Sequence, residues 1–195
     1  MKRYILPTFL ISVVAIISYF FVDKKLAHFF ASNPCCIKSF LGEFSRFGIS
    51  KYYLIVSFLV AVITYKYSKK VYRASLYIFS TLAISGIVII LIKVIFARYR
   101  PPMLFNKELY GFNWFDFGYL VNSFPSGHSA TAFSLFVALS LLAPKYKWVF
   151  LIFASLIALS RVALGVHFFS DILIGSLIGA LTSIYLYSKF YRVKA

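Results

Sequence analysis

The sequence predicts an all-α integral membrane protein, a six-transmembrane-helix bundle with interfacial helices in its outside loops. Three observations support this fold class. Of the 195 residues, 62% are hydrophobic and only 13% are charged, whereas a soluble domain is about 25% charged. The apolar residues gather in six stretches, most of them near the ~20 residues that cross a bilayer. Lys and Arg outnumber Asp and Glu, which gives a net charge of +16.

This composition excludes several classes of protein. A disordered chain contains far fewer aliphatic and aromatic residues. A basic soluble protein would suggest nucleic acid as a partner, but this chain has too few charges to cover a soluble domain. Its positive charge is better explained by cytoplasmic loops, by contact with anionic lipid or by an anionic substrate. The adjacent Cys35 and Cys36 suit neither an ordinary disulfide nor a metal site.

Each apolar stretch is expected to be a helix, because backbone groups in lipid must bond within their own segment. The predicted spans are residues 4–22, 52–65, 74–96, 126–143, 148–164 and 169–188. The second span is marginal in length. The first follows Lys2 and Arg3, as in a signal peptide, but the residues at 22–25 do not form a small-residue cleavage site. We therefore expect the first helix to be retained.

The distribution of basic residues predicts the orientation. With the N-terminus inside, the inner segments are residues 1–3, 66–73, 144–147 and 189–195. These 22 residues hold 11 Lys or Arg and no acidic residue. Lys and Arg favour the cytoplasmic side, so we expect both termini in the cytoplasm. The cell membrane of a bacterium is the expected location.

Two long connections lie on the predicted outer side. Residues 23–51 have apolar residues at helical spacing, which predicts one or two amphipathic helices, either in the interface or packed on the bundle. Residues 97–125 are rich in aromatic residues, which favour the headgroup level. No internal repeat or linker divides the chain, so residues 1–195 are expected to form one domain.

Three polar clusters lie at the outer ends of the spans, where ionisable residues are candidates for function. In the first, Lys93, Arg98 and Arg100 precede Pro101 and Pro102. Lys93 and Arg100 are seven residues apart. Seven residues are about two helical turns, so both cations point along one face if the helix continues to the prolines and ends there. The simpler alternative is a pair of cations that extend towards water at a helix end.

The second cluster, Pro125-Ser126-Gly127-His128, begins the fourth span. A helix N-terminus offers free N–H groups and a positive dipole, which together favour an anion. Gly127 permits close approach to the backbone, and His128 lies in the first turn. An ordinary capped helix with a chance histidine is the alternative interpretation.

The third cluster contains Ser160-Arg161, His167 and Asp171. His167 and Asp171 are one helical turn apart, and a carboxylate at that distance orients an imidazole and stabilises its charged form. A His–Asp pair with a purely structural role is the alternative. The three clusters share the outer side, and together they suit a phosphoryl group: cations and N–H donors for its oxygens, one histidine to attack and one to protonate the leaving group.

These residues resemble the tripartite signature of the type-2 phosphatidic acid phosphatase superfamily. The resemblance covers the core motifs at residues 93–171. It implies that His167 attacks phosphorus to form a phosphohistidine, that Asp171 orients His167, and that His128 protonates the leaving group and then activates water. It also implies a set of phosphate-binding residues: Lys93, Arg100, Ser126, Gly127 and Arg161. No metal and no other cofactor is expected, and the single motif carboxylate could not form a cage for a hard cation.

The resemblance therefore implies a metal-independent lipid phosphatase with its site on the extracytoplasmic side. The expected partners are a phosphorylated lipid and the bilayer, with no nucleic acid and no obligatory protein partner. Its substrate would be phosphatidic acid, phosphatidylglycerol phosphate, undecaprenyl pyrophosphate or a lipid A phosphate. The alternatives are a lipid phosphotransferase, a vanadate-dependent haloperoxidase and an anion or lipid transporter. High hydropathy argues against the haloperoxidase, and polar residues confined to one face argue against the transporter.

Overall fold

The computed structural model describes residues 4–33 and 36–191, which are mostly helical. Its α-helices are α1 (Ile5–Phe21), α2 (Asp23–Ser32), α3 (Cys36–Ser45), α4 (Ser50–Thr64), α5 (Lys69–Phe96), α6 (Pro101–Lys107), α7 (Gly127–Leu142), α8 (Lys147–Ala163) and α9 (Phe169–Leu186). Short 3-10 turns form η2 (Arg46–Gly48), η3 (Tyr119–Val121) and η4 (Pro144–Tyr146), and a π-helical turn forms η5 (Tyr187–Tyr191). The predicted all-α class is confirmed for these residues. Cys35, and with it the prediction about the cysteine pair, lies outside them.

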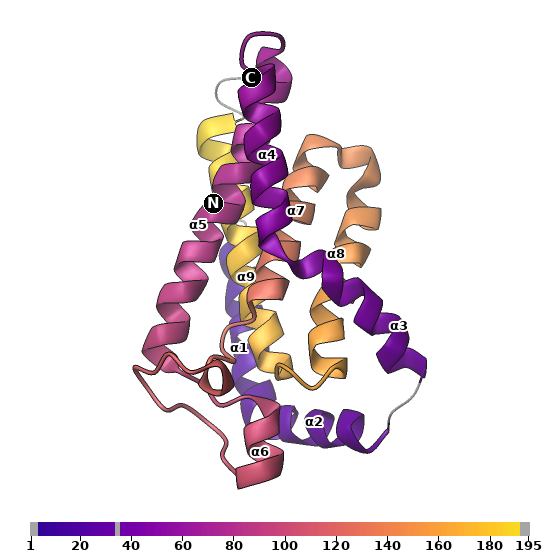
Figure 1. Ribbon diagram of the computed structural model, residues 1–195, viewed down its shortest axis with the longest axis vertical. Coiled ribbons are helices and arrows are strands. Elements are labelled where there is room, and N and C mark those ends of the chain that lie inside the picture. The colour runs from indigo at the N-terminus through magenta and orange to yellow at the C-terminus, as the bar shows by residue number, and fades with distance from the viewer. Residues whose placement is uncertain (1–3, 34–35, 192–195) are drawn as a thin grey trace.

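Helix α9 lies at the centre of the bundle. It packs against α7, α1 and α5, while α7 also contacts α8 and α5, and α4 runs along α5. Helices α2 and α6 and the aromatic loop lie at one end, and the connection between α4 and α5 lies at the other (Figure 1). This arrangement leaves the outer faces of the long helices to the lipid.

The helices identify the chain as an integral membrane protein, but the predicted count of six spans is not confirmed. Among the described residues, four stretches are long and apolar enough to cross a membrane: Lys38–Thr64, Lys69–Phe96, Pro144–Ala163 and Phe169–Tyr191. A fifth is added if α1 and α2, bent by 62° relative to each other, count as one span. Helix α7 is shorter, because its 16 residues extend only about 24 Å.

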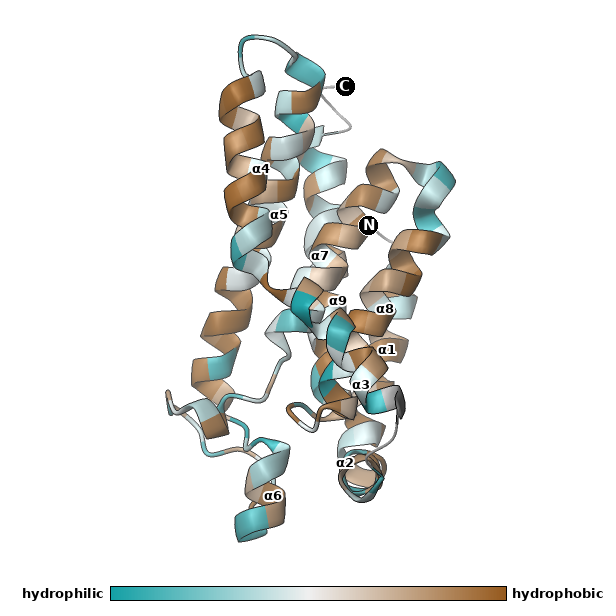
Figure 2. Ribbon diagram, turned by 45° about the vertical axis from the view of Figure 1, so that its right-hand side comes forward, coloured by the Kyte–Doolittle hydropathy of each residue, from teal (hydrophilic) through white to brown (hydrophobic). Residues whose placement is uncertain are grey.

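The outward faces match a lipid environment. Hydrophobic residues dominate α4, α5 and α8 along most of their length (Figure 2). Large apolar side chains such as Phe9, Ile63 and Ile90 are each more than half exposed. In water such a surface would drive aggregation, whereas in a bilayer it is the ordinary exterior of a helix bundle.

The segment at residues 23–51 packs on the bundle, which is one of the two predicted interpretations. Helix α2 contacts α8 and α9, and α3 lies along α8. Through η2, α3 leads into α4, so the marginal second span becomes part of the 27-residue stretch Lys38–Thr64. The third span ends at Phe96, as predicted, although its helix begins earlier, at Lys69.

Lys93 and Arg100 would lie on one helix face only if the third span continued to the prolines, and it does not. Helix α5 ends at Phe96, and Ala97 adopts a left-handed conformation with φ 42°. Arg100 is instead the N-cap of α6, and Pro101 is the first residue of that helix. The first helical position lacks an intrahelical N–H partner in any case, so proline is well suited to begin a helix there.

Glycines let α7 and α9 approach each other closely. A Cβ atom at Gly175 would lie 2.4 Å from the carbonyl oxygen of Ser126, and one at Gly179 would lie 2.3 Å from that of Ala130. One turn further along, Ser183 Oγ donates a hydrogen bond of 2.6 Å to the carbonyl oxygen of Ser134. Small residues spaced by four stabilise helix pairs in membranes, since they allow backbone-to-backbone contact.

We predict that Gly179→Ala destabilises the bundle by about 1–3 kcal/mol, because the added methyl group meets backbone atoms that cannot move aside. Gly86→Ala is the matched control: nothing lies within 4 Å of a Cβ at Gly86, which is within α5. That change should leave stability unchanged or raise it by about 0.5–1 kcal/mol. Thermal denaturation of both variants in detergent measures the difference, and equal melting temperatures would contradict the role assigned to the close contact.

Candidate active site

The structure brings the predicted site residues to one end of the bundle, where α5 and α8 end and α7 and α9 begin. Three hydrogen bonds tie these helix ends together. Lys93 Nζ donates to the carbonyl oxygen of Asn122 at 2.5 Å. The amide of Ser126 donates to the carbonyl oxygen of Asp171 at 3.1 Å. Arg100 reaches the carbonyl oxygen of Val166 at 3.0 Å.

Arg100 is held by backbone and by an aromatic ring. Its Nε donates to the carbonyl oxygen of Tyr119 at 2.8 Å, and one terminal nitrogen donates to that of Asn122 at 3.3 Å. The guanidinium centre lies 4.2 Å from the centroid of the Tyr119 ring, a cation–π contact. Asn122 thus accepts from both Lys93 and Arg100, which fixes the two cations beside each other although they lie on different elements.

Arg161, in the last turn of α8, is the third cation of this group. One of its terminal nitrogens donates to Ser45 Oγ, and its buried Nε has no hydrogen-bond partner. Lys93, Arg100 and Arg161 are close enough to influence one another electrostatically. Within residues 4–33 and 36–191, none of the three forms an ion pair with an Asp or Glu side chain. The three cations therefore lie together without a protein counter-ion.

The N-terminus of α7 adjoins these cations. Ser126 is its N-cap and accepts a hydrogen bond from the amide of Ser129 at 3.4 Å. A Cβ at Gly127 would have only Ile89 within 4 Å, at 3.9 Å, so glycine at this position leaves open space rather than filling a packing need. Free amides and open space at a helix N-terminus are what an anion requires.

His128, in the first turn of α7, packs on Gly48 at the end of η2. A Cβ at Gly48 would lie 2.5 to 2.9 Å from three carbon atoms of the His128 side chain. Glycine is therefore needed at this position for the imidazole to keep its place. Lys93, Arg100 and Arg161 all act electrostatically on His128, which places it at the same group of cations.

His167 lies in the turn between α8 and α9 and is almost completely buried. The turn is closed by the amides of Val166 and His167, which both donate to the carbonyl oxygen of Arg161 at 3.1 and 3.2 Å. Burial is the main cause that lowers the pKa of His167 to about 3; Lys93 and Arg100 lower it further, and Asp171 opposes them. The imidazole is therefore neutral at neutral pH, as a nucleophile must be.

Asp171 faces His167 through one of its carboxylate oxygens. Oδ2 lies 3.6 Å from His167 Nδ1, beyond ordinary hydrogen-bond length. Ser123 lies between them: its hydroxyl donates to Oδ2 at 2.6 Å and is 3.4 Å from Nδ1. The amide of Phe168 also donates to Oδ2, at 2.9 Å. Nδ1 thus faces the carboxylate, which leaves Nε2 as the other nitrogen of the ring.

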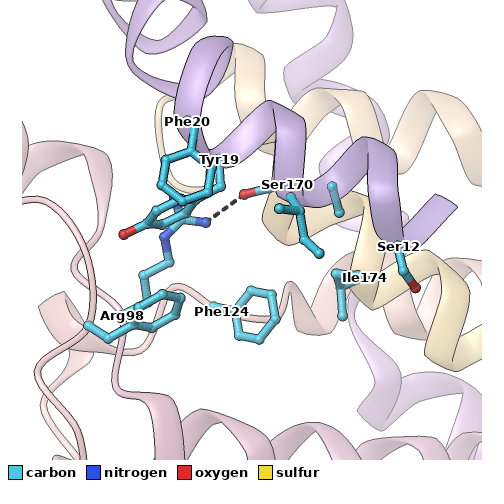
Figure 3. Close-up of a pocket in the computed structure, with 10 residues that line it drawn as sticks. Ser12, Tyr19, Phe20, Arg98, Phe124, Ser170 and Ile174 are labelled. Carbon is cyan, nitrogen blue, oxygen red and sulfur yellow. Dashed lines mark hydrogen bonds between the residues drawn. The ribbon is translucent and has the colours of Figure 1, made fainter. Parts of the chain in front are cut away.

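The sequence analysis did not assign roles to several residues that shape this site. Arg98, just outside the motif positions, is fully buried and bonds Asp171 Oδ1 at 2.5 Å. It also bonds Ser170 Oγ at 2.7 Å (Figure 3). Ser123 and Gly48 contact the two histidines, and Asp23 contacts Arg98 from α2. The sequence offered only weak signals for two of them. Arg98 is an additional basic residue between Lys93 and Arg100, and Asp23 is an acidic residue directly after the first predicted span.

The described part of the chain contains no group of three or more His, Cys, Asp or Glu side chains placed to hold a metal ion.

The third histidine, His28, lies on α2, where its ring packs edge-on against Phe105 with centroids 5.2 Å apart. This contact joins α2 to α6 at the margin of the bundle.

Comparison with known proteins finds relatives that are phosphatases. The chain is 35% identical to the lipid A 1-phosphatase of Rhizobium etli over 103 residues, 53% of this chain and 44% of that protein. It is 33% identical to the undecaprenyl-diphosphatase of Sulfolobus acidocaldarius over 111 residues, 51% of this chain and 49% of that protein. The chain thus spans about half the length of the curated relatives it matches.

Two solved structures share the fold. Aquifex aeolicus LpxE aligns with a TM-score of 0.65 and 24% identity over 86% of this chain and 95% of that one. The transmembrane PAP2-type phosphatidylglycerolphosphate phosphatase of Bacillus subtilis aligns with a TM-score of 0.65 and 19% identity over 96% and 97%. The family model of the PAP2 superfamily matches residues 74–195, which include all three motifs. This match and the phosphatase relatives identify the protein as a phosphoric ester hydrolase. The chain therefore belongs to the PAP2 superfamily, as its motifs indicated.

Proposed function

We propose that the protein is a metal-independent lipid phosphatase that works through a phosphohistidine at the outer face of a bacterial cytoplasmic membrane. One observation carries the proposal: Lys93, Arg100 and Arg161 are largely buried together beside a helix N-terminus, with no acidic side chain among the described residues in an ion pair with them. Buried charges are normally paired. Three cations without a counter-ion indicate that the missing partner is an anionic ligand, and a phosphoryl group fits the available donors.

In the first step, Nε2 of neutral His167 attacks phosphorus. The P–N bond forms as the bond from phosphorus to the leaving oxygen breaks. His128, in its protonated form, donates a proton to that oxygen and becomes neutral. Asp171, on the Nδ1 side of His167, stabilises the positive charge that the ring gains. The dephosphorylated lipid leaves, with its chains still in the bilayer.

In the second step, His128 takes a proton from a water molecule that attacks the phosphohistidine. The P–N bond breaks, its electron pair returns to Nε2 of His167, and orthophosphate is released. Lys93, Arg100 and Arg161, with Ser126 and the backbone amide of Gly127, bind the phosphoryl oxygens throughout. Preorganised donors of this kind stabilise the charge of the transition state without reorganisation.

The substrate class follows from where the site lies and from the relatives. The site is at one end of the bundle. We propose six membrane crossings: the four long spans, α1 together with α2 as a fifth, and α7 as a sixth. With these crossings, the site lies at the level of the lipid headgroups. The curated relatives are named for lipid A 1-phosphate and undecaprenyl diphosphate. We therefore place the substrate among lipids with a terminal phosphate or diphosphate.

Purified protein in mixed micelles should release orthophosphate from at least one of four lipids: phosphatidic acid, phosphatidylglycerol phosphate, undecaprenyl diphosphate or lipid A. Release should persist with excess chelator and should be inhibited by vanadate, which mimics the five-coordinate phosphorus. Comparing orthophosphate released with lipid consumed separates hydrolysis from transfer to an acceptor alcohol. Loss of activity with chelator and its return with Mg²⁺ would contradict the proposed mechanism.

We predict that His167→Ala lowers kcat by about 10³-fold or more, because it removes the nucleophile and no neighbouring group replaces it. Acid-quenched samples with ³²P-labelled substrate should show labelled wild-type protein and no label on the variant. His28→Ala, which changes a histidine outside the site, is the control and should retain both label and turnover. An unchanged kcat in His167→Ala would refute the role of this histidine.

Gly48→Ala should lower kcat by roughly 10²-fold, because the added methyl group displaces His128 and a misplacement of about 1 Å has effects of that size. Gly42→Ala is the matched control. A Cβ at Gly42 meets only Leu164, at an ordinary 3.5 Å, so its kcat should match the wild-type value. Steady-state kinetics of the two variants provides the test, and equal rates would show that η2 does not position His128.

A further inference from the structure

A buried polar network connects α2 to the site through Arg98, which is fully buried. One terminal nitrogen of Arg98 bonds Asp171 and Ser170; the other bonds Asp23 Oδ2 at 2.8 Å and the Tyr110 hydroxyl at 2.9 Å. Figure 3 shows Arg98 extending to Ser170 beside Tyr19. Arg98 thus joins its own segment between α5 and α6 to α2, to α9 and to the loop after α6. Its charge lies in contact with two carboxylates.

Asp23 also binds the first turn of α9 directly. Its Oδ1 accepts a hydrogen bond from the amide of Ser170 at 2.9 Å, and its Oδ2 accepts one from the Ser170 hydroxyl at 2.5 Å. A carboxylate near a helix N-terminus satisfies free amides and interacts favourably with the helix dipole. Here the carboxylate comes from a different helix, so α2 fixes the start of the helix that carries Asp171.

The network fixes both oxygens of Asp171. Arg98 holds Oδ1 at 2.5 Å, while Ser123 and the amide of Phe168 hold Oδ2 at 2.6 and 2.9 Å. With both oxygens held, the carboxylate cannot rotate, and Oδ2 stays turned towards His167 Nδ1. The position of Arg98 therefore decides how the carboxylate presents itself to the histidine.

Charge balance gives Asp23 a second effect. Two carboxylates share the single positive charge of Arg98, which leaves the cluster with a net charge of −1. Burial opposes the charge on Arg98, but Asp171 and Asp23 together raise its pKa, so the guanidinium stays charged. Without Asp23, Arg98 would neutralise Asp171 alone, and less negative charge would face the imidazolium that forms during attack.

We propose that Asp23 and Arg98 are positioning residues that orient Asp171 and preserve its negative charge towards His167. This proposal rests on the proposed function and adds to it. It assigns a part in catalysis to α2, a helix that lies outside the matched residues 74–195. The pair acts through Asp171 and does not touch the substrate.

Asp23→Asn keeps the shape of the side chain and removes its charge. We expect kcat to fall about 10-fold, the size typical of residues that orient a site residue. KM and the inhibition constant of orthophosphate should stay within about twofold of the wild-type values, because the cation group is intact. Glu108→Gln, an exposed carboxylate just after α6, is the control for loss of one negative charge and should leave kcat unchanged.

Arg98→Gln and the double variant Arg98→Gln/Asp23→Asn test the charge balance. The single variant leaves two buried carboxylates without their cation and should lose most of its turnover. Removing the charge of Asp23 as well should restore part of kcat, since the repulsion disappears. Ser170→Ala removes a bridging hydroxyl and no charge; it should lower kcat a few-fold with KM unchanged, and it decides the question if Asp23→Asn does not fold.

The outcomes separate this proposal from the proposed function. An active wild type together with unaltered kcat in Asp23→Asn, or in Ser170→Ala where Asp23→Asn does not fold, would overturn the positioning role alone. Equal rises in KM and in the inhibition constant of orthophosphate, with a lowered melting temperature, would also overturn it, because they indicate general loss of structure. A folded wild type that hydrolyses none of the four lipids would overturn the proposed function, and this proposal with it.

Discussion

Two buried carboxylates share one guanidinium, and the rest of the site depends on that arrangement. Arg98 takes both Asp23 and Asp171 as partners. Of the five acidic residues in the chain, the other three lie on α3 and in the connection that follows α6, where Glu43 and Glu108 are exposed and Asp116 is half-buried. Among the described residues, no acidic side chain forms an ion pair with Lys93, Arg100 or Arg161. Asp171 acts electrostatically on Lys93 and Arg100, but its ion pair is with Arg98. Since a buried charge without a partner is costly, this distribution favours an anion as the missing partner.

The close contact of α7 and α9 links the charges around Arg98 to the N-terminus of α7. Gly175 lets α9 approach Ser126 so closely that the amide of Ser126 bonds the carbonyl oxygen of Asp171 at 3.1 Å. Ser126, the N-cap that is proposed to bind the anion, and Asp171, which faces His167, are thereby joined backbone to backbone. A shift of either helix would move both halves of the site together, which keeps their relative geometry constant while the surrounding lipid fluctuates.

The sequence predicted the helical class, the end of α5 and the meeting of three motifs at one end of the bundle, because apolar periodicity and motif spacing are local signals. It did not predict that Arg100 is the N-cap of a separate short helix, α6, since the left-handed Ala97 that separates the two helices has no residue signature. Asp23 lies 75 residues from Arg98 and Gly48 is remote in sequence from His128. Such contacts depend on how helices pack, and a single sequence does not encode that packing in any local pattern.

Charge matching connects the network to the proposed chemistry. Lys93, Arg100 and Arg161 contribute three positive charges, and the cluster of Asp23, Arg98 and Asp171 contributes one net negative charge. The site therefore carries about +2 when both histidines are neutral, and about +3 when His128 is protonated for the proposed first step. A phosphomonoester carries roughly −1.5 to −2 at neutral pH. Bound orthophosphate has nearly the same charge and shape, so the cations alone cannot distinguish product from substrate. In the proposed reaction, discrimination must then come from the lipid chains, because the bilayer keeps a phosphate beside the site only while that phosphate is attached to them.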